Sequence, residues 1–132
     1  MITTPYHANI EKLTIDNPNF RKVIYTGNHC QLVLMSLLPS EEIGLETHPK
    51  NDQFFRFEKG QGKAIVSGQE FELSDGTALI VPAGVEHNIV NTGPEPLRFY
   101  TLYSPAHHID GRVHVTKFEA EKDVEDEEFG NK

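Results

Sequence analysis

Short runs of β-branched and aromatic residues, separated by turn residues, recur along the middle of the chain. They fall at residues 31–38, 53–58, 63–67, 70–73, 77–81, 87–90 and 97–103. Gly, Pro, Asn and Asp between the runs are typical of tight turns, and Gly68-Gln69 favours a hairpin. Strands that recur about every ten residues predict an all-β antiparallel sandwich or barrel.

Helical patterns are weak at both ends of the chain. Residues 11–18 favour a short helical turn, whereas 117–128 have a helical composition without an apolar stripe. Residues 119–132 contain seven acidic residues and two lysines, so we expect a solvated, disordered tail. The predicted organisation is an N-terminal extension (1–30), a barrel with its C-terminal loop (31–118) and an acidic tail (119–132). The extension is expected to pack outside the barrel or to exchange with a partner.

Composition narrows the class of protein. The 132 residues are enough for one domain with one core. The net charge is −8 without a basic stripe, which argues against nucleic-acid binding. No apolar run approaches the roughly 20 residues of a membrane span, and no signal-peptide pattern opens the sequence, so a cytoplasmic location is expected. Cys30 is the one cysteine and is expected to be a buried, small hydrophobic side chain.

The strongest motif surrounds His87. It has the spacing Gly76-x5-Pro82-x-Gly84-x2-His87-x3-Asn91. The two glycines suit tight turns, the proline stiffens a strand end, and the histidine opens a new strand with its ring free to point inward. This stretch resembles the second motif of the cupin superfamily at all five fixed positions.

A second stretch resembles the first cupin motif, His-x-His-x3,4-Glu-x6-Gly. It runs from Glu46 and His48 to Gln53 and then Gly60. Glu46 replaces the first histidine and Gln53 replaces the glutamate. Together with the strand series the resemblance covers residues 31–104. It implies a double-stranded β-helix, or jelly-roll, barrel that holds one metal ion inside, in a protein that forms a homodimer.

The predicted metal ligands are Glu46, His48, Gln53 and His87. Alternate residues of a strand face the same side, so Glu46 and His48 point together. Gln53 would face the other way in an unbroken strand, but the turn-forming residues 49–52 reset the phase. Two oxygens and two imidazole nitrogens suit one divalent transition metal, Zn, Fe, Mn, Ni or Co, better than Ca or Mg.

The predicted function is a metal-dependent enzyme that acts on a small polar substrate such as a sugar or sugar acid. An isomerase-type reaction would combine a Lewis acid with proton transfer, although the sequence assigns no catalytic residue. An Fe-dependent dioxygenase is one alternative, and a non-catalytic cupin that binds a small ligand is another. Polar groups beyond the metal ligands would favour the isomerase, whereas aromatic walls such as Phe55 and Phe57 would favour a binder of apolar ligands.

The sequence leaves the roles of two other stretches open. His48-Pro49-x-Lys resembles part of the metal site of phosphomannose isomerases, but Lys50 is better explained as a solvated turn residue. The ligand set also resembles that of cupins that cyclise unsaturated uronates, except at its first position.

Residues 107–114 contain three histidines and an aspartate. We interpret them as a polar loop across the barrel mouth or a dimer contact, with a lid or a second metal site as the alternative.

Overall fold

The computed structural model describes residues 4–132, which form nine strands and three short helices. The strands are β1 (Arg21–Thr26), β2 (Gln31–Leu37), β3 (Asp52–Lys59), β4 (Gly62–Val66), β5 (Gln69–Leu73), β6 (Ala78–Val81), β7 (His87–Asn91), β8 (Leu97–Ser104) and β9 (Val113–His114). The helices are α1 (Ile10–Asp16), α2 (Lys117–Lys122) and α3 (Val124–Gly130). None of these described helices is long and apolar enough to cross a membrane.

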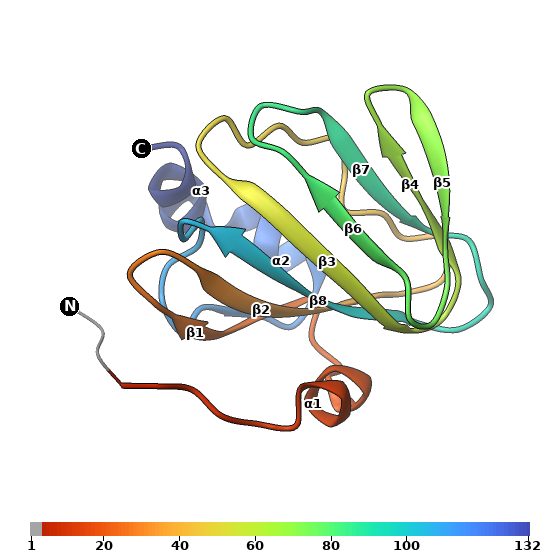
Figure 1. Ribbon diagram of the computed structural model, residues 1–132, viewed down its shortest axis with the longest axis horizontal. Coiled ribbons are helices and arrows are strands. Elements are labelled where there is room, and N and C mark those ends of the chain that lie inside the picture. Colours follow the sequence, from red (N-terminus) through yellow and green to blue (C-terminus); the bar gives the residue numbers. More distant parts are fainter. Residues whose placement is uncertain (1–3) are drawn as a thin grey trace.

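Two antiparallel sheets form the body of the molecule (Figure 1). The larger sheet has the order β6-β3-β8-β2-β1-β9, and the smaller has the order β5-β4-β7. β4 and β5 form the expected hairpin, in which Val66 pairs with Gln69. Strands that are neighbours in a sheet but distant in sequence, such as β3 with β8, give the crossed connections of a jelly roll. The predicted all-β double-stranded β-helix is therefore confirmed.

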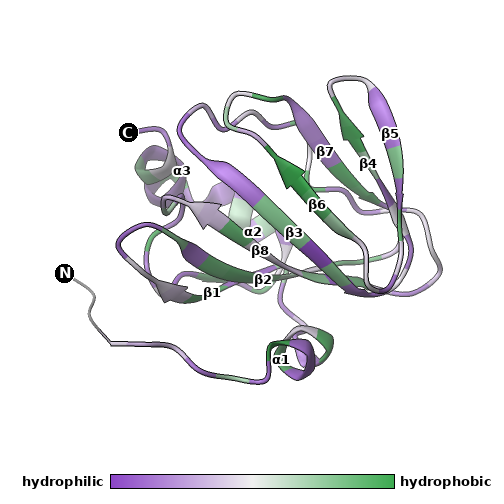
Figure 2. Ribbon diagram, in the orientation of Figure 1, coloured by the Kyte–Doolittle hydropathy of each residue, from purple (hydrophilic) through white to green (hydrophobic). Residues whose placement is uncertain are grey.

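The interior of the barrel changes from apolar to polar along three strands. The inward-facing residues of β3, β7 and β8 are buried. Hydrophobic residues also dominate β2 and β6 (Figure 2). The inward-facing residues are Phe57, Phe55 and Gln53 on β3; Leu97, Phe99, Thr101 and Tyr103 on β8; and Ile89 and His87 on β7. Side chains of alternate strand residues line one face, so each strand adds both to the core and to a polar end. The polar end is where the predicted metal ligands lie.

The turns around the β7 motif have the predicted backbone geometry. Gly76 and Gly84 have φ angles of +87° and +84°, a region that side chains with a Cβ rarely adopt. The Asn91 side chain closes the following turn, since its Oδ1 accepts from Gly93 N at 2.9 Å. Its Nδ2 donates to the Leu37 carbonyl, which ties the turn to β2. The motif thus sets where β7 begins and ends.

The predicted N-terminal extension contributes a strand to the larger sheet. β1 pairs with β2 and with β9, and Val23 is buried in the core. α1 lies before β1 and is held to β8 by a hydrogen bond from the Arg98 guanidinium to the Ile15 carbonyl. The extension is therefore part of the fold from α1 onward, while its first three residues lie outside the described part. Cys30, expected to be buried, is exposed between β1 and β2.

The prediction of a disordered acidic tail is wrong. Residues 117–122 and 124–130 are helical, and Asp126 on α3 is buried. Its Oδ2 lies 2.7 Å from Nδ1 of His108, and its Oδ1 accepts from the backbone N of Ile109 at 2.7 Å. Thr116 and Asp123 cap the two helices with their side-chain oxygens. The tail docks through these polar contacts, which hydrophobic periodicity does not reveal.

Replacing Asp126 with alanine tests this docking. The change leaves the Nδ1–H of His108 and the N–H of Ile109 without their acceptor, so we expect the free energy of unfolding to fall by about 2 kcal/mol or more. Denaturant unfolding measures the change. Glu128→Ala, at an exposed position of the same helix, is the matched control and should cost less than about 0.5 kcal/mol. Equal stabilities of the two variants would show that α3 does not dock in solution.

Candidate metal centre

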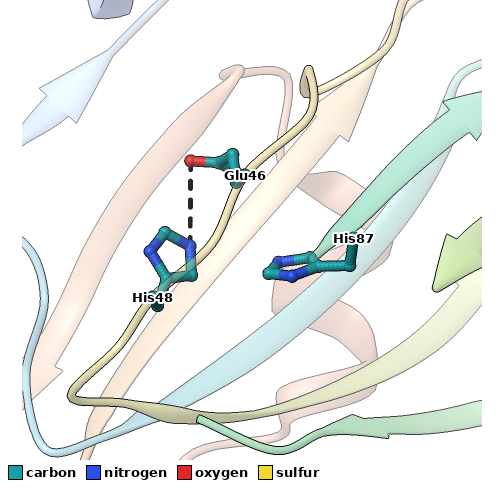
Figure 3. Close-up of side chains that lie close together, drawn as sticks. All are labelled: Glu46, His48 and His87. Carbon is teal, nitrogen blue, oxygen red and sulfur yellow. Dashed lines mark ion pairs between the residues drawn. The ribbon is translucent and has the colours of Figure 1, made fainter. Parts of the chain in front are cut away.

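A short antiparallel bridge brings Glu46 and His48 to the start of β7. The backbone N of Glu46 donates to the His87 carbonyl at 2.8 Å, and the N of His87 donates to the Glu46 carbonyl at 2.9 Å. The N of Gly84 donates to the His48 carbonyl at 3.0 Å, which aligns the next two residues. Figure 3 shows the side chains of Glu46, His48 and His87 close together.

Three of the four residues predicted as ligands form one cluster. Potential ligand atoms of Glu46, His48 and His87 all lie within 4.8 Å of one another. Oε2 of Glu46 is 3.7 Å from Nε2 of His48, the contact drawn as a dashed line in Figure 3. His48 and His87 are buried, whereas the Glu46 side chain is 32% exposed. The cluster therefore lies at the inner end of an opening rather than sealed in the core.

Gln53 also faces the interior. A turn at residues 49–50 separates it from His48, and in β3 it pairs with Tyr103 of β8. Its Nε2 donates to Oγ1 of Thr101 at 3.0 Å, which orients the amide. Its Oε1 is buried and has no hydrogen-bond partner in the described structure. The side chain thus offers an oxygen donor, as expected of a metal ligand at this position.

The buried donor atoms fit a metal ion. Nε2 of His48, Nε2 of His87 and Oε1 of Gln53 all lack a hydrogen-bond partner among residues 4–132. The Nδ1 of His87 lies 3.0 Å from the carbonyl of Val85. A carbonyl only accepts, so Nδ1 carries the proton and Nε2 presents its lone pair. Each buried polar atom without a partner costs about 1–3 kcal/mol, and a cation bound within the cluster would satisfy both imidazole nitrogens.

The electrostatic environment keeps both imidazoles neutral. Burial, together with His107, His87 and Arg21, lowers the pKa of His48 to about 3. Burial also lowers the pKa of His87, although the hydrogen bond to Val85 opposes this. Burial raises the pKa of Glu46, while the positive charges of Arg21 and Lys117 lower it. Neutral histidines near pH 7 are the form that coordinates a metal.

A cavity of about 310 Å³ opens beside the cluster. Glu46 and His48 line it together with Arg21, His107 and Lys117. Residues of α2 and α3 form part of its wall, so the docked C-terminal segment shapes the approach to the cluster. The volume is at the low end of that of ligand pockets, which suits a small molecule.

His107, which the sequence did not single out among the histidines of residues 107–114, lies against the cluster. Its ring centroid lies 4.2 Å from that of His48, and its Nδ1 is 3.2 Å from Oδ1 of Asn51. Asn51 Nδ2 donates to the Pro105 carbonyl at 2.6 Å, which leaves Oδ1 to accept. His107 therefore carries its proton on Nδ1, and its Nε2 is the basic nitrogen. The histidine-rich loop had indicated the region but not which histidine meets the cluster.

The remaining histidines of that loop have structural partners. His108 pairs with Asp126, and Nε2 of His114 lies 2.9 Å from Oδ2 of Asp123. His114, Asp123 and Asp126 are close enough to hold an ion. However, the two carboxylates already accept hydrogen bonds, and the Arg112 guanidinium lies 3.2 Å from Asp123. This second cluster therefore anchors the C-terminal helices. Unlike the first cluster, it has no buried imidazole nitrogen without a hydrogen-bond partner among the described residues.

Lys50 lies away from the cluster that the phosphomannose isomerase resemblance linked it to. It is exposed, and its ammonium group donates to the backbone carbonyl of Lys132. It thus serves as a contact between the turn after His48 and the C-terminus. The structure favours the interpretation of Lys50 as a turn residue.

Comparison with known proteins defines the class. The Cupin domain family matches residues 33–103, so the chain belongs to the cupins. It is 43% identical over 122 residues to the uncharacterized protein YrkC of Bacillus subtilis (strain 168), covering 88% of this chain and 66% of that protein. It is 42% identical over 116 residues to the uncharacterized protein L612 of Acanthamoeba polyphaga mimivirus, covering 85% of this chain and 72% of that protein.

A solved structure supports the same assignment. The crystal structure of BH2720 from Bacillus halodurans superposes with a TM-score of 0.89 at 42% sequence identity. The match covers 90% of this chain and 95% of that one. The membership of the cupin superfamily expected from the two motifs is thereby confirmed.

The buried histidines predict how stability depends on pH in the metal-free protein. Burial lowers the pKa of His107 and of His108 to about 4 from the ordinary value of 6.5. Between these values the unfolded chain binds more protons than the folded chain, so the free energy of unfolding falls as the pH falls. Each histidine contributes up to about 1.4 kcal/mol per pH unit. Denaturant unfolding at a series of pH values from 7 to 4 measures the decline.

Two variants identify the source of the slope. His108→Gln removes one titrating group and should flatten the decline, whatever its effect on absolute stability. His29→Gln, at an exposed position, is the matched control and should leave the slope as it is. The assignment would be wrong if the two variants had the same slope.

Proposed function

We propose that this cupin is a metal-dependent enzyme that acts on a small polar substrate of the size of a sugar or sugar acid. Glu46, His48, Gln53 and His87 would hold one divalent transition metal ion. The substrate would enter through the cavity beside this donor set. The homodimer and the cytoplasmic location expected from the sequence stay predictions.

The donor set supports a Lewis-acid role for the ion. Two imidazole nitrogens with two oxygens favour Zn, Fe, Mn, Ni or Co over Ca or Mg. When bound, such an ion polarises a carbonyl or hydroxyl oxygen and lowers the pKa of the hydroxyl. Glu46 contributes the one negative charge of the set, because the Gln53 amide is neutral. The set therefore carries the same charge as three histidines with one glutamate.

The polar lining of the cavity carries the proposal. Arg21, His107 and Lys117 line it beyond the proposed ligands Glu46 and His48. The aromatic side chains that would make a wall for an apolar ligand, Phe55 and Phe57, are instead fully buried in the core. This arrangement favours proton-transfer chemistry on a polar substrate over the binding of an apolar ligand.

His107 is the side chain best placed to move a proton. It lines the cavity, and its ring packs against His48. Asn51 fixes its Nδ1–H, so Nε2 carries the lone pair that would accept a proton from a substrate carbon or hydroxyl and return it to a neighbouring atom. A base that takes and returns the same proton is what an isomerisation requires. No other co-reactant enters such a reaction.

Metal analysis tests the ligand assignment. Protein purified without added metal or chelator should contain one divalent transition metal ion per chain. His87→Ala removes one of two nitrogen donors, so we expect a more than tenfold loss of affinity, since even the loss of a group that only supports a ligand costs about 10–100-fold. After removal of the metal with a chelator, metal addition should raise the melting temperature of the wild type but not of the variant.

The control for this experiment is His29→Gln, which changes an exposed histidine. It should bind metal as the wild type does. Unchanged metal stoichiometry in His87→Ala would refute the assignment. The identity of the ion is informative in itself: iron would favour the dioxygenase alternative, and zinc would favour isomerisation.

Gln53→Glu and His107→Gln separate catalysis from binding. Gln53→Glu adds a second negative charge to the donor set, so we expect metal to be retained while turnover changes several-fold or more. His107→Gln should also retain metal but lower turnover by about 100-fold or more, since it removes the base. A panel of sugar phosphates, uronates and keto acids provides the substrates. Absence of turnover across the panel with metal bound would favour the dioxygenase or the binding protein instead.

A further inference from the structure

Arg21 is a buried cation without a partner of opposite charge. Its residue is 7% exposed, and its Nε is buried without a hydrogen-bond partner in the described part of the chain. None of the ion pairs formed within residues 4–132 includes it. A buried charge is ordinarily paired, because removing it from water costs several kcal/mol. An anion bound beside this guanidinium would therefore stabilise it.

The guanidinium is held in place from behind. In the β1–β9 pairing Arg21 lies opposite His114, and its Nη1 is 3.4 Å from Nδ1 of His114. Arginine only donates, so His114 accepts at Nδ1 and donates from Nε2 to Asp123 at 2.9 Å. The guanidinium also lies 5.2 Å from the centre of the Phe20 ring. These contacts orient Arg21 but do not neutralise it.

Arg21 faces the same cavity as the proposed metal ligands. It lines the cavity of about 310 Å³ together with Glu46 and His48, and Lys117 from α2 lines it as well. Both cations are close enough to Glu46 to lower the pKa that burial raises. Two positive side chains therefore lie within reach of one small ligand bound beside the cluster.

The acidic residues around the cavity do not supply the missing anion. Asp126 is committed to His108 and to the backbone of Ile109. Glu121 and Glu127 are exposed at the rim, where solvent and salt screen their charges. Glu46 would be committed to the metal ion in the function proposed above. The anion that pairs with Arg21 is therefore expected to be a ligand that binds in the cavity.

We propose that Arg21, assisted by Lys117, forms an oxyanion subsite that binds the carboxylate or phosphate group of the substrate. This inference rests on the proposed function, because it takes the same cavity as the substrate site. A guanidinium matches either group with two parallel hydrogen bonds, whereas an ammonium acts as a point charge. The substrate class is then an anionic molecule of monosaccharide size, with its polar body toward Glu46 and His48 and its charged end at Arg21.

Calorimetric titration with three matched sugars tests the subsite. Metal-loaded full-length protein is titrated with D-glucuronate, glucose 6-phosphate and glucose at constant ionic strength. We expect at least one of the two anions to bind at least tenfold more tightly than neutral glucose. The anion that binds more tightly identifies whether the subsite takes a carboxylate or a phosphate. Equal affinities for all three sugars would overturn the proposal.

Variants of Arg21 and Lys117 test whether these two cations cause the preference for anionic sugars. Arg21→Met should abolish the preference for the anion while glucose affinity and metal content stay as in the wild type, and Arg21→Lys should restore part of it. Lys117→Met, at a half-buried position on α2, should reduce the preference several-fold and stands as an independent test should the buried substitution prevent folding. Lys22→Met, at an exposed position of β1, is the matched control. An undiminished preference in both Arg21→Met and Lys117→Met would refute the subsite.

Repeating the titration without metal separates the two proposals. If the protein takes up no metal yet prefers the anions through Arg21, the proposed metal enzyme fails and the subsite stands. If metal binds stoichiometrically but no sugar anion is preferred, the subsite fails and the metal centre stands. Metal content and anion preference are thus two independent readouts.

Discussion

The paired backbone hydrogen bonds between Glu46 and His87 hold the candidate site together. The segment that carries Glu46 leads into β3 of the larger sheet, whereas His87 opens β7 of the smaller sheet. A two-way exchange of N–H and C=O groups sets the register of two strands, and a slip of one residue would turn every side chain to the other face. Because of this bridge, Glu46 and His48 lie beside His87 at the start of β7, and the three side chains form one cluster.

The C-terminal helices complete what the barrel leaves open. They supply part of the cavity wall, and they dock through the buried Asp126 rather than through an apolar face. Their end comes very close to the site: a Cβ at Gly130 would lie 2.8 Å from Cε1 of His107. Only a glycine permits that approach without displacing the loop. The acidic tail is therefore part of the cavity that the proposed substrate would enter.

Much of the fold and part of the site could be predicted from local sequence. The alternation of apolar runs and turns corresponds to the observed strands, because strand and turn preferences act over a few residues. The facing of Glu46 and His48 follows from their spacing of two. Gln53 faces inward as expected because the turn at residues 49–50 breaks the strand phase. The positive φ angles of Gly76 and Gly84 were equally foreseeable from the motif.

Tertiary structure alone decided the rest of the site. Arg21 reaches the cavity through the pairing of β1 with β9, which joins residues 93 positions apart in the sequence. His107 meets His48, and Asp126 meets His108, only after the loop and the tail have folded back over the barrel. Such contacts join a few polar atoms across long stretches of chain and leave no periodic pattern behind. The sequence by itself therefore determined the barrel and its two cupin motifs, while long-range polar contacts determined the shape and charge of the cavity beside them.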